Sequence, residues 1–275
     1  MIMAMAVLSA VLFSCVREEM TCDKELIVVQ RIGEGGYVYT RGAAISSNTD
    51  LKEETFGLYG SLTPNASVPQ PYFNASATVN ADLTAAISPL QYWPGLMNAS
   101  MTFFSWYPYS DANAPTASFT DPGEMVLNYT ANASAANHVD VLAAISGPVW
   151  VEGVNIHFYR TLTKVTFTFK KVAPVPDEVT IEGIEFQNVG KSGKLVMAEI
   201  PTATTKNGKP KFVWSDVATG KVASTPTGNK TVTEDATLMG DTFLMLPTDA
   251  FSATAKIVVT TNFGDREFLF SDIIA

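Results

Sequence analysis

The sequence contains very little histidine and cysteine. His138 and His157 are the only histidines in 275 residues, and both cysteines, Cys15 and Cys22, lie near the amino end. Beyond residue 22 the chain therefore has no cysteine for a disulfide, a His/Cys zinc site or a Cys-His nucleophile pair. We expect no metal site and no cofactor, and a fold that depends on packing and backbone hydrogen bonds.

Basic residues and catalytic motifs are also scarce. The chain has 18 Lys and Arg against 27 Asp and Glu, a net charge of −9, and no basic cluster, so nucleic acid is not an expected partner. It contains no Gly-x-Ser-x-Gly motif, no phosphate-cradling loop and no metal-spaced histidine pair. Neighbouring acidic residues fall at turns or on polar faces of expected strands, which favours solvated surface over a glycosidase pair. We expect no catalytic residues and no enzyme activity.

Long apolar runs and sustained helical periodicity are missing too. A membrane-spanning helix needs about 20 apolar residues, whereas the uncharged run at the start covers only Met1–Val11. Many short strand-like runs separated by Gly, Pro and Asn instead predict an all-β sandwich fold. Residues 162–170 show the pattern most clearly, because Val165, Phe167 and Phe169 alternate with polar residues.

The amino end has the form of an export signal. An apolar run closed by Leu12-Phe13-Ser14-Cys15 is typical of a lipoprotein signal peptide ending in a lipobox. We expect a signal peptide over residues 1–14, cleavage between Ser14 and Cys15, and acyl chains on Cys15. Residues 15–24 would then form a lipidated tether. The alternative is an ordinary secretory signal in which Cys15 is incidental.

The length and the different character of the two halves predict two tandem β-sandwich domains. We place the amino-terminal domain at residues 25–155 and the carboxy-terminal domain at residues 156–275. The first strand is expected in the β-branched run Glu25–Gln30, which contains Leu26, Ile27, Val28 and Val29. The glycines of Gly33–Gly36 are expected to end it.

Three further stretches carry expectations about local structure. Met101–Tyr109 is the densest aromatic segment, and a core strand is favoured over an exposed ligand platform because aromatic residues mostly pack in cores. Lys191–Lys194, with Ser192 and Gly193 at its centre, is expected to be a turn. A hairpin is expected from Lys256–Thr261 and Glu267–Ile274.

Short motifs recur in a particular order along nearly the whole chain. They are the lipobox cysteine, Leu26–Val29, Thr40-Arg41-Gly42, Phe56–Tyr59, Tyr92-Trp93-Pro94, Phe103–Pro108, Asp140–Ala143, Phe158–Val165, Val179–Phe186 and Phe243–Pro247. Together they resemble the fimbrillin precursors of the Bacteroidales order, the Mfa/FimA-like family. The resemblance implies two transthyretin-like sandwiches, a palmitate-bearing lipoprotein of the outer membrane, and assembly with other fimbrial subunits into a cell-surface fimbria that serves adhesion.

The resemblance also assigns roles near the amino end. In this family an arginine-specific protease removes the first strand, and a strand from another subunit then fills the groove. Residues 25–41 match the removable strand, with Leu26–Val29 as its apolar part and the cut between Arg41 and Gly42. Arg31 is the rival site of cleavage. Cys15 matches the lipidated cysteine.

The carboxy end departs from the family pattern. Members usually continue past the position of Ile274 with an aromatic-rich final strand, whereas this sequence stops at Ala275. Two interpretations follow: a fragment with a truncated second domain, or a tip subunit without a donor strand, so shaft and tip roles both stay open. The alternative function is a surface lipoprotein that does not polymerise and binds glycan or protein. Exposed aromatic side chains in residues 103–109 would favour that alternative, because sugar rings stack on aromatic faces.

Overall fold

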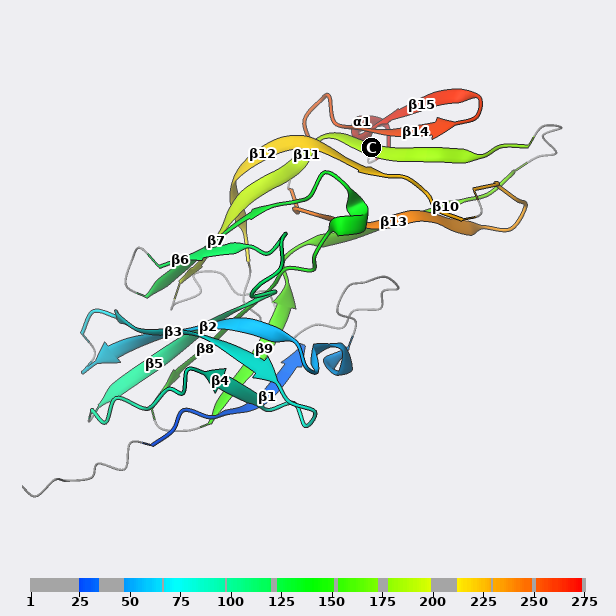
Figure 1. The fold of residues 1–275 in the computed structure, drawn as a ribbon. Coiled ribbons are helices and arrows are strands. Elements are labelled where there is room, and N and C mark those ends of the chain that lie inside the picture. The colour runs from blue at the N-terminus through cyan, green and yellow to red at the C-terminus, as the bar shows by residue number, and fades with distance from the viewer. Residues whose placement is uncertain are drawn as a thin grey trace, which may run out of the picture.

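The computed structural model describes residues 25–34, 47–65, 67–96, 98–119, 123–150, 153–172, 178–198, 212–228, 230–248 and 251–273. Within these ranges the fold is all-β, as the sequence predicts, with 15 strands and one four-residue α-helix (Figure 1). The predicted lipidation and cleavage residues Ser14, Cys15, Arg41 and Gly42 lie outside the described residues. No helix in the described ranges has the length and apolar character of a membrane span.

Seven strands close into a barrel, the lower part of Figure 1. In pairing order they are β1 (Val29–Glu34), β4 (Ala85–Ser88), β3 (Gln70–Val79), β2 (Thr55–Pro64), β5 (Ala99–Tyr107), β8 (Leu142–Val149) and β9 (Val154–Arg160). The 3-10 turn η1 (Asn48–Leu51) precedes β2. The first strand closes the ring, because β1 pairs with β4 on one side and runs parallel to β9 on the other.

The other eight strands form two sheets in the upper part of Figure 1. One sheet contains β10 (Thr163–Phe169) and β13 (Thr237–Met245). The other contains β15 (Gly264–Leu269), β14 (Lys256–Thr261), β11 (Ile181–Ala198), β7 (Glu124–Thr130) and β6 (Thr116–Ser118), with β12 (Trp214–Ser224) also paired to β11. Side chains from both sheets meet in one core, where Phe243 of β13 lies 4.8 Å from Phe186 of β11 between ring centroids. The short elements η2 (Ala135–Asn137) and α1 (Phe270–Ile273) complete this part.

Strands β2 and β5 are buried on both faces. Phe103 of β5 faces the barrel core, whereas Phe104 and Trp106 belong to the cluster that packs the barrel against β7 and β11. The prediction of a core strand for Met101–Tyr109 is therefore confirmed for these residues. Gly57 of β2 lies directly opposite Trp106, and a Cβ there would sit 2.1 Å from the indole ring. Glycine is required at this position so that the indole can lie flat on β2.

The predicted turn at Lys191–Lys194 is wrong, because β11 continues through it as an 18-residue strand. Its first part pairs with β14 and its last part with β7, while β12 follows it along both. Gly193 serves close packing in this strand, since a Cβ there would lie 2.9 Å from Leu246. The predicted hairpin is present as β14 and β15, although residues 270–273 form α1 instead of continuing the strand.

The sheets do not follow the two halves of the sequence. The expected division between residues 155 and 156 falls within β9, a strand of the barrel. β6 and β7 come from the first half of the chain but join β11 in the second part of the molecule. The chain thus leaves the barrel after β5, adds two strands to the upper sheet, and returns to complete the barrel with β8 and β9.

Candidate functional site

Residues 25–34 lie between β4 and β9, and their backbone is hydrogen-bonded to the chain on both sides. On the β4 side the bonds run from Trp93 N–H to the Glu25 carbonyl (2.9 Å), from Ile27 N–H to the Gln91 carbonyl (2.9 Å) and from Ile32 N–H to the Leu83 carbonyl (2.8 Å). On the other side Val154 N–H donates to the Val28 carbonyl at 2.9 Å, and the parallel ladder with β9 follows. One contiguous segment therefore closes the barrel.

The side chains of this segment divide between the core and the surface. Ile27, Val29 and Ile32 belong to the barrel core, with 2%, 0% and 0% of their surface exposed. Leu26 and Val28 point outward, and Val28 is 44% exposed. The predicted removable residues Leu26–Val29 thus lie together in this segment. Strand β1 covers Val29–Glu34, so it lies later in the chain than the predicted run Glu25–Gln30, and its last residue falls within Gly33–Gly36, where the strand was expected to end. Alternation places every second apolar side chain inside.

A bulge in β1 decides which later residue is buried. The pairing with β9 shifts between Val29, opposite Val154, and Arg31, opposite Asn155. Because side chains alternate between faces, strict alternation after Val29 would turn the Arg31 side chain into the core. The extra residue resets the register, so that Ile32 is buried and Arg31 stays exposed.

The buried side chains of residues 25–34 contribute strongly to the stability of the barrel. Burial of a large aliphatic side chain contributes about 1.5–3 kcal/mol, so Ile27, Val29 and Ile32 together contribute about 5–9 kcal/mol. A whole domain is usually stable by only about 5–15 kcal/mol. Loss of this segment would also leave backbone groups of β4 and β9 unpaired, and such edges template the addition of another strand. The barrel therefore needs a strand between β4 and β9.

The two arginines proposed as cleavage sites differ in position. Arg31 lies in the middle of β1 and is held in the ladder opposite Asn155. A protease takes its substrate as an accessible, locally unfolded segment, so cutting at Arg31 requires β1 to open first. Arg41 lies outside the described residues.

The described ranges contain no group of three or more His, Cys, Asp or Glu side chains placed to hold an ion. His138 is instead tied into the fold, since its Nδ1 accepts a hydrogen bond from Leu244 N–H at 2.9 Å and its Nε2 lies 3.0 Å from the Asn132 carbonyl. Burial lowers the pKa of this histidine, which favours the neutral ring that this bonding pattern needs.

The fold and the position of β1 between β4 and β9 define a class of all-β proteins. In this class the amino-terminal strand closes a barrel and later strands form two further sheets. The sequence model of the family described as fimbrillin-like matches residues 40–273. The chain belongs to this family, as the order of its motifs indicated. No curated protein sequence matches it.

Two solved structures share the fold at low sequence identity, and a third aligns with a lower TM-score. A candidate cell adhesion protein from Bacteroides ovatus aligns with a TM-score of 0.51 and 15% identity over 90% of this chain and 86% of its own. One from Bacteroides uniformis gives a TM-score of 0.52 and 13% identity over 88% and 83%. The fimbrial anchor protein Mfa2 from Porphyromonas gingivalis gives 0.43 and 9% identity over 90% and 82%.

Proposed function

We propose that this protein is a subunit of a cell-surface fimbria that serves adhesion and assembles by exchange of its first strand. Family membership supports the fimbrial role. The main observation in favour of strand exchange is the position of β1. One contiguous segment places three aliphatic side chains in the barrel core and pairs with the strands on both sides. A strand of the same pattern from another subunit has the same backbone partners and the same core positions available.

We place the maturation cut at Arg41, between Arg41 and Gly42, rather than at Arg31. A cut at Arg41 frees the whole of β1, whereas a cut at Arg31 leaves Ile32 and the rest of the strand attached to the body. The paired position of Arg31 also opposes cleavage while the barrel is closed. The partners are then an arginine-specific protease and other fimbrial subunits. The barrel and the second pair of sheets are proposed as the two domains of the family.

Arg41→Ala is expected to abolish both release of the first strand and polymer formation. An arginine-specific protease should cut the wild-type chain between Arg41 and Gly42, and polymers should appear in gel filtration and electron micrographs. Arg31→Ala is the matched control and should mature like the wild type. Polymers that form equally well from Arg41→Ala, or a barrel that unfolds on cutting while complementary subunits are present, would exclude strand exchange.

Anchoring through Cys15 is proposed to hold the precursor at the outer membrane. Two or more acyl chains give stable attachment, at about 0.8 kcal/mol per buried CH₂ group. Cys15→Ala should move most of the protein from the membrane fraction to the soluble fraction, as measured by immunoblotting. Cys22→Ala is the control and should leave it in the membrane fraction. Unchanged fractionation of Cys15→Ala would refute the anchor.

The alternative function, a surface lipoprotein that does not polymerise and binds glycan or protein, has one specific observation in its favour. Tyr109, the last residue of the aromatic segment, is 39% exposed although its neighbour in space, Trp106, is buried. This exposure favours glycan binding but does not argue against polymerisation, because a subunit can polymerise and also bind glycan.

A further inference from the structure

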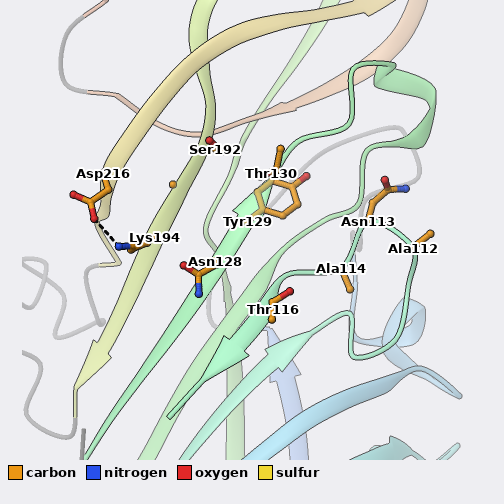
Figure 2. Close-up of a pocket in the computed structure, with 11 residues that line it drawn as sticks. Ala112, Asn113, Ala114, Thr116, Asn128, Tyr129, Thr130, Ser192, Lys194 and Asp216 are labelled. Atoms are coloured by element: carbon orange, nitrogen blue, oxygen red, sulfur yellow. Dashed lines mark ion pairs between the residues drawn. The ribbon is translucent and has the colours of Figure 1, made fainter. Parts of the chain in front are cut away.

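A polar pocket of about 440 Å³ lies on the sheet formed by β7, β11 and β12 (Figure 2). Asn128 of β7 and Lys194 of β11 are directly opposite one another in the ladder. Lys194 Nζ in turn contacts Asp216 Oδ2 of β12 at 3.0 Å. Three neighbouring strands thus present an amide, an ammonium group and a carboxylate to the same space, so the pocket holds both donors and acceptors.

A second pocket, of about 460 Å³, adjoins the first. The two share Ala112, Ala114 and Thr116, which lie on the loop before β6 and at its start. The second pocket is aromatic: the exposed ring of Tyr109 lies 6.0 Å from the buried ring of Trp106 between centroids. Tyr109 therefore stands at the surface with a fixed indole behind it.

The loop between the two pockets is fixed and small. Asn113 N–H donates to Asp111 Oδ1 at 2.8 Å, and Ala114 N–H donates to the Asp111 carbonyl at 3.0 Å. The amide of Asn132 donates to Asn113 Oδ1 at 2.8 Å and ties the loop to the end of β7. The residues that line both pockets, Ala112, Ala114 and Thr116, have small side chains, so a ligand that spans both pockets meets no large side chain among them.

We propose that the two pockets form one cleft that binds a neutral oligosaccharide. One sugar ring stacks on Tyr109, and a second ring places its hydroxyls against Asn128, Lys194 and Asp216. Hydroxyl groups need donors and acceptors together, which this side of the cleft supplies. The Lys194–Asp216 pair cancels its own charge, so a sulfated or sialylated glycan gains nothing over a neutral one. Each pocket by itself, of about 440 and 460 Å³, lies within the ~300–1,000 Å³ range of small-molecule sites.

The test uses the full, uncut chain, so that it does not depend on strand exchange. An array of immobilised neutral, sialylated and sulfated oligosaccharides is probed first, and the best neutral compound is then titrated calorimetrically. Binding is expected for neutral compounds of two or more rings. Tyr109→Ala and Asn128→Ala should each weaken it about tenfold or more, as expected for contacts at the centre of a binding site.

Tyr92→Ala is the matched control, because Tyr92 is also 39% exposed but does not line either pocket. It should bind like the wild type, and circular dichroism should show that all three variants are folded. The proposal is overturned if no neutral oligosaccharide binds, if only charged glycans bind, or if Tyr109→Ala and Asn128→Ala bind as tightly as Tyr92→Ala. Failure of fimbrial assembly would leave these outcomes unchanged.

Discussion

Replacing Ile32 with alanine is expected to lower the free energy of unfolding by about 2–5 kcal/mol. The Ile32 side chain has 0% of its surface exposed and lies in the barrel core at the point where the β1 bulge restores inward orientation. Truncation removes three carbons of buried side chain and leaves a cavity, because the neighbouring strands hold the surrounding side chains in place. Urea denaturation followed by tryptophan fluorescence measures the change.

Val28→Ala is the matched control on the same segment. Val28 is 44% exposed, so its loss should change the free energy of unfolding by no more than about 0.5 kcal/mol. The contrast between the two variants separates filling of the barrel from general β propensity. Equal and small effects of Ile32→Ala and Val28→Ala would show that β1 lies on the barrel without sealing it.

Asp140→Ala is expected to cost about 3–5 kcal/mol, the usual effect of removing one partner from a buried ion pair. Asp140 Oδ2 lies 3.2 Å from an Arg160 guanidinium nitrogen, and the two side chains are only 2% and 11% exposed. Arg160 ends β9, and the next residue, Thr161, accepts the indole N–H of Trp214 at 2.7 Å. The pair therefore lies where the barrel passes into the second pair of sheets, and loss of Asp140 would remove a carboxylate that balances the buried guanidinium charge.

Two further variants identify the cause. Glu267→Ala removes the exposed partner of the Lys256 pair and should cost less than about 1 kcal/mol. Arg160→Met in the Asp140→Ala background should recover part of the lost stability, because it removes the buried charge that Asp140 balances in the wild type. Each variant is followed by urea denaturation. A cost below about 1 kcal/mol for Asp140→Ala would mean that water reaches the guanidinium.

Local patterns in the sequence predicted individual strands and one hairpin. The alternation of Val165, Phe167 and Phe169 predicted β10, and the run from Lys256 predicted the β14–β15 hairpin. The core placement of Phe103 followed from its aromatic surroundings. In these cases the side-chain period, the aromatic composition or a short turn carries the information, so an isolated sequence is sufficient.

Local patterns did not predict the features that depend on pairing between segments far apart in the sequence. Lys191–Lys194 has the composition of a turn, yet the ladder with β7, more than 60 residues earlier, holds it extended. The bulge that buries Ile32 and exposes Arg31 depends on β9. The cleft likewise brings Asn128 next to Lys194 through strand register alone. Only a signal for long-range pairing, which a single sequence does not contain, could have revealed these three features.

The most direct test of strand exchange is uptake of a labelled first-strand peptide. A fluorescent peptide with the sequence of residues 25–34 is added in excess to the chain before and after cutting by an arginine-specific protease, which is inhibited before the peptide is added. Strand exchange predicts stable uptake only after the cut, a higher melting temperature of the cut protein with bound peptide, and no uptake of a peptide with aspartate in place of Ile32. Equal uptake by the uncut chain, or none after complete cutting of a protein that stays folded, would contradict it.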